Sequence, residues 1–148
     1  MDTKNQKSFA VITGASQGLG KAFAEELALQ RYPVILISLP HQGLPELASF
    51  IKNKYQVETA YYETDFSEPA NILELANWLN KNFKIQILIN NAGIGGSKKI
   101  EDSNLSTITN IIHVNVHSTS ILTHQLLPNL KQHKYSYILN VSSIAAFS

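Results

Sequence analysis

Short apolar runs alternate along this chain with segments whose apolar residues recur at helical spacing. The clearest runs cover residues 9–13, 34–37 and 85–89, and residues 57–63 and 135–141 are two further strand candidates. Strands that are apolar throughout, separated by helices, are typical of a parallel sheet that is covered on both faces. With right-handed crossovers, the pattern predicts an α/β fold built on a doubly wound parallel sheet.

Helical spacing begins near Leu19, Leu47 and Pro69, and a long helical segment runs from about Leu105 to Leu130. No linker or internal repeat marks a second domain. The sequence therefore predicts one domain of the Rossmann type.

Composition excludes several classes of function. Of the 148 residues, 44% are apolar and 16% are charged, which fits a folded domain. The net charge is +1 without a basic stripe, so no nucleic-acid partner is expected. There is no cysteine, and no apolar run is long enough to span a bilayer. Residues 1–8 are polar and lack the apolar core of a signal peptide, so no membrane association and a cytoplasmic location are expected.

A glycine-rich turn at residues 13–20 joins the first strand to the first helix. Gly14 permits a tight turn, and Gly18 and Gly20 leave room for a ligand and for close packing of helix against strand. Backbone N–H groups at the helix start then face an anion. A nucleoside-triphosphate P-loop is disfavoured, because its first glycine and its metal-binding hydroxyl residue are both alanine here. A dinucleotide-binding turn and an ordinary strand–helix turn both fit these residues alone.

Three more motifs follow this turn in order. Residues 90–93 read Asn-Asn-Ala-Gly after the fourth apolar run, residues 114–116 read Val-Asn-Val within the long helical segment, and residues 138–143 read Ile-Leu-Asn-Val-Ser-Ser. Together with the glycine-rich turn, they resemble the motifs of the short-chain dehydrogenase/reductase family. The resemblance covers the chain from Phe9 onward and implies an oxidoreductase that uses a nicotinamide dinucleotide.

By this resemblance, the cofactor is held by the glycine-rich turn, by the ends of the second and third strands and by the turn after the fourth. The implied cofactor-binding residues are Gly14, Ser16, Gln17, Gly18, Leu19, Gly20, Ser38, Asp65, Phe66, Asn91, Ala92 and Gly93. Ser38 stands where an acid would accept the adenosine ribose hydroxyls of NAD, and no Arg follows it. NADP is therefore preferred to NAD, with Ser38 and either His41 or Lys21 near the 2′-phosphate.

Two of the implied residues also have a plain structural interpretation. Asp65 lies beside the adenine in the family, but it can equally cap the helix that begins near Pro69. Asn115 lies in mid-helix, where Asn is unfavourable because its side chain competes for backbone hydrogen bonds. The family uses this Asn to bend the helix and to hold a water of a proton relay, and the alternative is a buried, satisfied Asn. By the same resemblance, Ser143 polarises the carbonyl of the substrate.

Three histidines of the long helical segment have a spacing that metal ligands on a helix can have. His113 and His117 are four residues apart and His124 is seven further on, so they can share one helix face. No Asp or Glu joins them, and the family uses no catalytic metal. A solvated or interface face is therefore preferred, and no metal site is predicted.

The family's acid–base chemistry needs a Tyr and, four residues later, a Lys, roughly a dozen residues past Ser143. None of the six Tyr residues begins a Tyr-x-x-x-Lys pattern. We therefore expect residues 1–148 to be an incomplete NAD(P)-binding Rossmann domain, truncated after the fifth strand and inactive alone. The full-length protein is expected to be a homo-oligomer that transfers a hydride between NAD(P)(H) and a small carbonyl or alcohol substrate. The alternative is a non-catalytic dinucleotide-binding or sensor module on the same fold.

Overall fold

A five-stranded parallel sheet with the strand order β3-β2-β1-β4-β5 forms the centre of the molecule. The structure, a computed structural model, describes residues 8–95 and 99–143. The strands are β1 Phe9–Thr13, β2 Val34–Ser38, β3 Thr59–Glu63, β4 Ile85–Asn90 and β5 Tyr137–Asn140. The chain order reverses between β1 and β4, and such a reversal opens a crevice at the carboxyl ends of the strands. The predicted doubly wound fold of the Rossmann type is confirmed.

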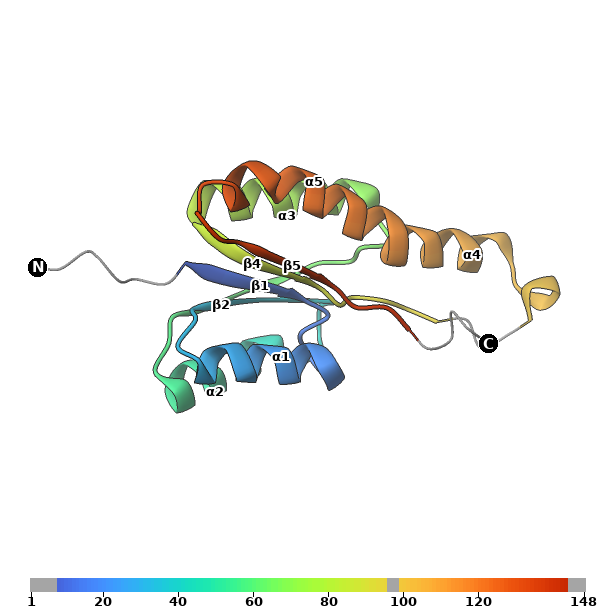
Figure 1. Cartoon of the computed structure of the whole chain (residues 1–148). Helices are drawn as coiled ribbons and strands as arrows, with labels where there is room; N and C mark the ends of the chain where they lie inside the picture. The colour runs from blue at the N-terminus through green and yellow to red at the C-terminus, as the bar shows by residue number, and fades with distance from the viewer. Residues whose placement is uncertain (1–7, 96–98, 144–148) are drawn as a thin grey trace, which may run out of the picture.

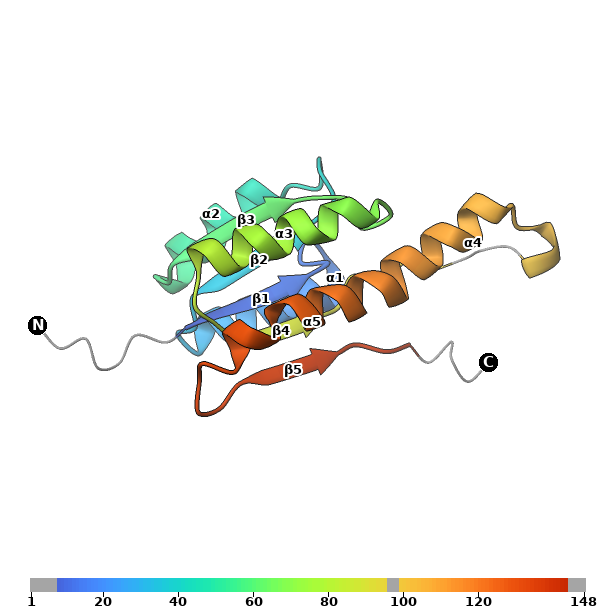
Figure 2. The same ribbon diagram turned by 90° about the horizontal axis from the view of Figure 1, so that it is seen from above.

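Helices cover both faces of the sheet: α1 and α2 lie on one face, and α3 and α5 lie on the other (Figure 1). Their bounds are α1 Gly18–Leu29, α2 Leu44–Tyr55, α3 Pro69–Asn82, α4 Leu105–Ile112 and α5 Ser118–Leu130, with a 3-10 turn η1 Ile100–Asp102 and a π-helical turn η2 His113–His117. Seen from above, α4 extends beyond the carboxyl ends of the strands (Figure 2). No helix within the described residues has the length and apolar character needed to cross a membrane.

The central strands are buried on both faces, which explains why they read as continuous apolar runs. Side chains of successive strand residues point to opposite faces. In β1, Val11 packs in the core formed with α3 and α5, whereas Ala10 and Ile12 pack in the core formed with α1 and α2. All three side chains are fully buried. The two cores hold the carboxyl ends of β1 and β4 in place between the helices.

The observed elements differ from the predicted ones in their limits. β3 begins at Thr59 instead of Val57, because its partner β2 begins directly after Pro33, which has no N–H to continue the ladder. β5 begins at Tyr137, since the carbonyl of Tyr135 accepts a hydrogen bond from the Gln86 side chain at 3.0 Å instead of joining the sheet. The long helical segment is interrupted by η2, and the 3-10 turn η1 precedes it.

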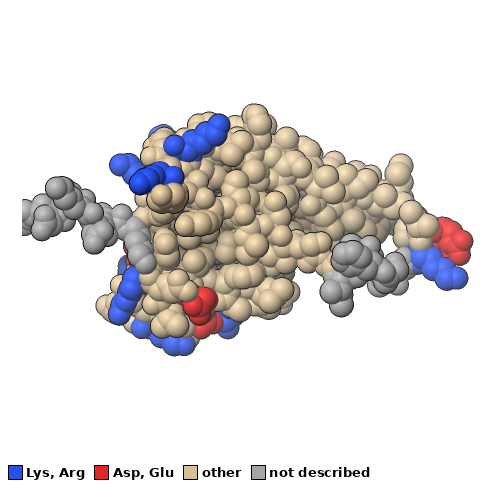
Figure 3. All heavy atoms as spheres, in the orientation of Figure 1, with Lys and Arg blue, Asp and Glu red and all other residues tan. Residues whose placement is uncertain are grey.

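The strand β5 lies at the edge of the sheet, with β4 as its neighbour. Tyr137, Ile138 and Leu139 are exposed there. On the face of the molecule in Figure 3, charged side chains lie toward the two ends, and the surface between them is formed by other residue types. The molecule therefore presents an apolar sheet edge that no charged residue of β5 protects.

Candidate functional site

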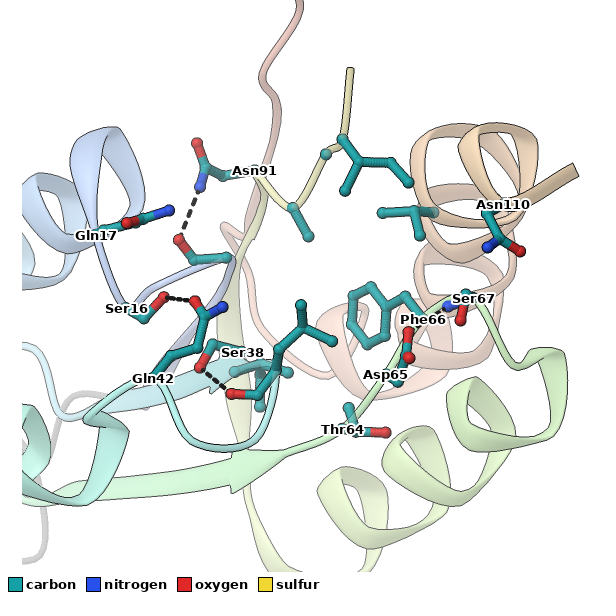
Figure 4. Close-up of a pocket in the computed structure, with 17 residues that line it drawn as sticks. Ser16, Gln17, Ser38, Gln42, Thr64, Asp65, Phe66, Ser67, Asn91 and Asn110 are labelled. Carbon is teal, nitrogen blue, oxygen red and sulfur yellow. Dashed lines mark hydrogen bonds between the residues drawn. The ribbon is translucent and has the colours of Figure 1, made fainter. Parts of the chain in front are cut away.

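A cavity of about 560 Å³ opens at the carboxyl ends of the central strands (Figure 4). Its volume lies in the range of roughly 300–1,000 Å³ that is usual for small-molecule sites. Among the residues predicted to bind the cofactor, those that line it are Gly14, Ser16, Gln17, Ser38, Asp65, Phe66, Asn91, Ala92 and Gly93. The lining residues that the sequence did not indicate are Ile37, Leu39, Gln42, Thr64, Ser67, Ile94, Asn110 and Val114.

Gly18, Leu19 and Gly20 of the glycine-rich turn do not line the cavity, although Gly14 does. Gly14 and Gly18 have φ angles of +65° and +55°, in the left-handed region that favours glycine. A Cβ atom on Gly20 would lie 2.1 Å from the Gly14 carbonyl oxygen, so glycine is required for α1 to start against the turn. Leu19 points outward and is 62% exposed.

The amino end of α1 is open to an anion. Its N-cap residue, Gln17, makes no side-chain hydrogen bond to the helix, and the first turn contains no acidic residue. The first N–H groups of a helix have no partners within it, and the helix dipole adds positive potential there. The turn therefore has the features of a phosphate-binding helix start.

Thr13 joins the glycine-rich turn to the turn after β4. Its side chain is 2% exposed, and its Oγ1 accepts hydrogen bonds from the backbone N–H groups of Asn91 and Ala92, both at 3.0 Å. The same hydroxyl donates to the Ile89 carbonyl at 3.4 Å. In return, Asn91 Nδ2 donates to the carbonyl oxygens of Thr13 and Gly14, at 3.1 and 3.2 Å. These contacts fix the two turns relative to each other at the point where the strand order reverses.

The ends of β2 and β3 form the other side of the cavity. Ser38 Oγ donates to the Leu39 carbonyl at 3.1 Å. Asp65 Oδ1 accepts the Ser67 N–H at 2.8 Å, and the N-cap residue of α3 is Glu68. The predicted alternative, in which Asp65 caps this helix, is therefore wrong: its carboxylate shapes the loop before the helix and also lines the cavity.

Asn115 lies within the π-helical turn η2, which interrupts the single long helix that the sequence predicted. Its Oδ1 accepts the Ile94 N–H and its Nδ2 donates to the Ile94 carbonyl, both at 2.9 Å. The residue is exposed, so the alternative of a buried Asn is wrong. Through this paired contact, η2 holds the chain segment that follows Gly93 at the rim of the cavity.

Ser143 follows β5 at the carboxyl edge of the sheet and is exposed, outside the lining of the cavity. The strand before it is held by Asn90, whose Nδ2 donates to Asn140 Oδ1 at 2.8 Å and to Thr123 Oγ1 at 3.0 Å. The Val141 N–H donates to the Asn90 carbonyl at 2.9 Å. The chain after Ser143 lies outside the described residues.

Two of the three histidines lie side by side on η2. The rings of His113 and His117 are 5.8 Å apart, and His113 Nδ1 donates to the Ser67 carbonyl at 2.9 Å. Within the described residues, no group of three or more His, Cys, Asp or Glu side chains is arranged to hold a metal ion. His113 thus connects η2 to the loop after β3.

The sequence matches the profile of the family described as short chain dehydrogenase over residues 8–148. The chain belongs to this family. Very-long-chain 3-oxoacyl-CoA reductase-B of Danio rerio is 35% identical over 139 residues, which are 91% of this chain and 44% of that protein. Inactive hydroxysteroid dehydrogenase-like protein 1 of Homo sapiens is 34% identical over 142 residues, or 95% of this chain and 43% of that protein. The chain thus spans less than half the length of these curated relatives.

Solved structures of short-chain dehydrogenases share the fold described above. L-sorbose reductase from Gluconobacter frateurii, complexed with NADPH and L-sorbose, has a TM-score of 0.89 and 27% identity. The match covers 99% of this chain and 56% of that one. The chain is therefore a member of an oxidoreductase family whose structural neighbours include NADPH complexes.

Proposed function

We propose that residues 1–148 form part of one NAD(P)-binding Rossmann domain in an oxidoreductase. The observation that carries this proposal is the network around Thr13, which joins the glycine-rich turn to Asn91 and Ala92. It lies at the reversal of strand order, where open α/β sheets bind their ligands. The NADPH complex of L-sorbose reductase, at 27% identity, supports the assignment.

The residues present fit a dinucleotide. Gly14 and Gly20 allow the glycine-rich turn to pack closely against its neighbours, because a Cβ on Gly14 would lie 2.9 Å from Ala92 Cα and one on Gly20 would lie 2.1 Å from the Gly14 oxygen. At Gly18 a Cβ would meet nothing within 4 Å, so the surface stays open to a ligand. The start of α1 would hold the pyrophosphate, and Asn91 to Gly93 would line the path toward the nicotinamide.

In the full-length protein, we propose hydride transfer to or from the carbon of a carbonyl or alcohol substrate. The bound nicotinamide supplies or accepts the hydride. Ser143 would donate a hydrogen bond to the carbonyl oxygen and stabilise the charge that develops on it. Asn115 would hold the Ile94 segment, and its amide keeps one further acceptor position and one further N–H for a relay water.

The acid–base pair of this chemistry has no counterpart in the sequence, which contains no Tyr-x-x-x-Lys pattern. We therefore propose that the 148-residue chain binds the cofactor without turning over a carbonyl substrate. The second candidate is a non-catalytic dinucleotide-binding module, favoured by the 34% identity to a human relative named as inactive. The coding sequence after Ser143 distinguishes the two, since only a catalytic protein needs the Tyr and the Lys.

The direct test measures NADPH oxidation by the full-length protein with three classes of ketone: a 3-oxoacyl thioester, a ketosteroid and a ketose. We expect turnover with at least one class, and a loss of at least about 100-fold in kcat for Ser143→Ala, because one donor to a developing oxyanion contributes on this scale. Full-length protein that binds NADPH but oxidises it with none of these ketones would favour the non-catalytic module. Protein that binds no nicotinamide nucleotide would refute both candidates.

A further inference from the structure

The loop after β3 forms one wall of the cavity. Its residues Thr64, Asp65, Phe66 and Ser67 all line the cavity. A ligand that fills the cavity therefore contacts this loop. Because ordering a loop during binding costs affinity, the affinity depends on how firmly the loop is held before the ligand arrives.

The loop after β3 is held by its own polar groups and, from a distant part of the sequence, by η2. Asp65 Oδ1 accepts the Ser67 N–H at 2.8 Å, and the Asp65 carbonyl accepts a hydrogen bond from Asn71 Nδ2 at 2.9 Å. His113 Nδ1 donates to the Ser67 carbonyl at 2.9 Å. A carbonyl oxygen only accepts, so Nδ1 carries a proton here. Ser67 lies beside α4, which carries Asn110 and continues into η2 (Figure 4).

The π-helical turn η2 contacts two walls of the cavity at once. His113 and Asn115 are two positions apart, so their side chains point to different sides of the turn. His113 bonds to Ser67, whereas Asn115 bonds to the backbone of Ile94, which lines the cavity after β4. Val114, between them, lines the cavity itself. The turn thus joins two parts of the lining that belong to different loops.

We propose that His113 is a positioning residue for the ligand, because its hydrogen bond to Ser67 fixes the loop after β3 in the conformation that binds the dinucleotide. This inference rests on the proposed function, since it takes a dinucleotide as the ligand. His113 does not line the cavity, so its effect reaches the ligand through the loop. Loss of one neutral hydrogen bond that holds the loop should weaken binding about threefold to tenfold.

The test is a calorimetric titration of the 148-residue chain with NADPH, in the wild type and in two matched variants. Leu and Asn side chains have the same branched shape, but only Asn can donate a hydrogen bond from the position of Nδ1. His113→Leu should weaken NADPH binding about threefold to tenfold, and His113→Asn should stay within about twofold of the wild type. His124→Leu, at an exposed position of α5 away from the cavity, is the control and should bind as the wild type does.

A purely structural role of His113 predicts a different result. In that case His113→Leu would lower the free energy of unfolding, while the folded chain kept the wild-type affinity for NADPH. Urea denaturation of each variant therefore accompanies the titrations. A second measurement needs no substitution: the exchange of the His113 Nδ1 proton with water is followed by NMR in the wild-type chain. NADPH should slow this exchange, because a ligand on the loop after β3 holds the Ser67 carbonyl in place.

The outcomes separate this inference from the proposed function. If the wild type binds NADPH and His113→Leu binds it equally well, or if His113→Asn is as weak as His113→Leu, the role of His113 is wrong and the dinucleotide site stands. If His113→Leu does not fold, the proton exchange decides, and a rate that NADPH leaves unchanged would overturn the inference. If the folded wild-type chain binds no NADPH, the proposed function fails and the inference fails with it.

Discussion

Gly18 and Gly20 are two positions apart, and each requires glycine for a different physical reason. Gly18 has a φ of +55° in open space, so a side chain there meets conformational strain alone. Gly20 has no such φ, but a Cβ on it would overlap the Gly14 carbonyl oxygen at 2.1 Å. The strain at Gly18 is local, whereas the overlap at Gly20 forces helix α1 away from the turn.

Alanine substitutions should separate these two causes. We expect Gly18→Ala to lower the free energy of unfolding by about 1 kcal/mol, the usual cost of a left-handed conformation for an L-residue. Gly20→Ala should cost at least about 2 kcal/mol, because backbone atoms must move. Urea denaturation of the two variants measures the difference. An equal or larger cost at Gly18 would contradict this account of the turn.

A substitution at Gln17 is expected to raise the stability of the fold while it lowers the affinity for NADPH. It is the N-cap of α1 with extended backbone angles and no side-chain hydrogen bond to the helix. Gln17→Asp should therefore raise the free energy of unfolding by about 0.5–1 kcal/mol, because Asp caps well. It should also weaken NADPH binding about fivefold or more, because its carboxylate repels the pyrophosphate.

The control for this prediction is Gln17→Asn, since Asn caps a helix as well as Asp does but carries no charge. Thermal unfolding and NADPH titration are measured on both variants. We expect both to be stabilised and only the Asp variant to bind NADPH less tightly. Equal NADPH affinities in the two variants would argue against a phosphate at the start of α1.

At the scale of elements, the π-helical turn η2 and the segment after β4 form one unit. The Asn115 side chain makes two hydrogen bonds to the Ile94 backbone, and these are the contacts that join them. π-helical turns are rare and are often found at functional sites. The turn lies beside the cavity, since its residue Val114 forms part of the lining.

Replacing Asn115 by Leu should free the segment after β4 from η2. Both hydrogen bonds are lost, at about 0.5–1.5 kcal/mol each, so the free energy of unfolding should fall by about 1–3 kcal/mol. The Ile94 amide, which now donates to Asn115, should exchange its hydrogen faster in the variant. Hydrogen exchange measured by NMR checks this, with Ser120→Ala on the exposed side of α5 as the control. Unchanged exchange at Ile94 would show that the segment is held in another way.

Some of the observed elements and contacts were predictable from the sequence, and others were not. The runs of β1, β2 and β4 were predictable, because burial on both faces requires apolar residues throughout. The π-helical geometry was not predictable, because one unfavourable Asn in a helical pattern does not reveal how the backbone around it is hydrogen-bonded. Gln42 was missed for a related reason: an exposed loop glutamine carries no local signal, and its partner Ser16 is 26 positions away. Ser38 and the glycine-rich turn were indicated by the resemblance to the family, so the sequence located the cavity and much of its lining but not the contact between Ser16 and Gln42.

At the scale of the whole molecule, β5 forms an exposed apolar edge of the sheet. Ile138 and Leu139 are 40% and 43% exposed on this edge strand, and the surface beside them is largely uncharged (Figure 3). An unprotected apolar edge offers backbone groups and side chains to another strand. We therefore expect the 148-residue chain to self-associate as its concentration rises.

Leu139→Lys should weaken this self-association, because a charge on an edge strand opposes strand pairing. Sedimentation velocity over a concentration series measures the effect, and circular dichroism verifies that the fold is kept. Ser136→Lys, exposed just before β5, is the charge-matched control and should have a smaller effect. If the Leu139 variant associates as strongly as the wild type, the contact lies elsewhere, for example on α4 and η2, where Ile112 and Val116 are exposed.

We propose that the cavity at the carboxyl ends of β1, β2 and β4 binds a nicotinamide dinucleotide. The most direct measurement is a calorimetric titration of the folded 148-residue chain with NADPH, repeated in the presence of excess adenosine 5′-diphosphate. We predict saturable binding to one site per chain that the competing nucleotide displaces. Absence of saturable binding by a chain that unfolds cooperatively, or binding that adenosine 5′-diphosphate does not displace, would contradict the claim.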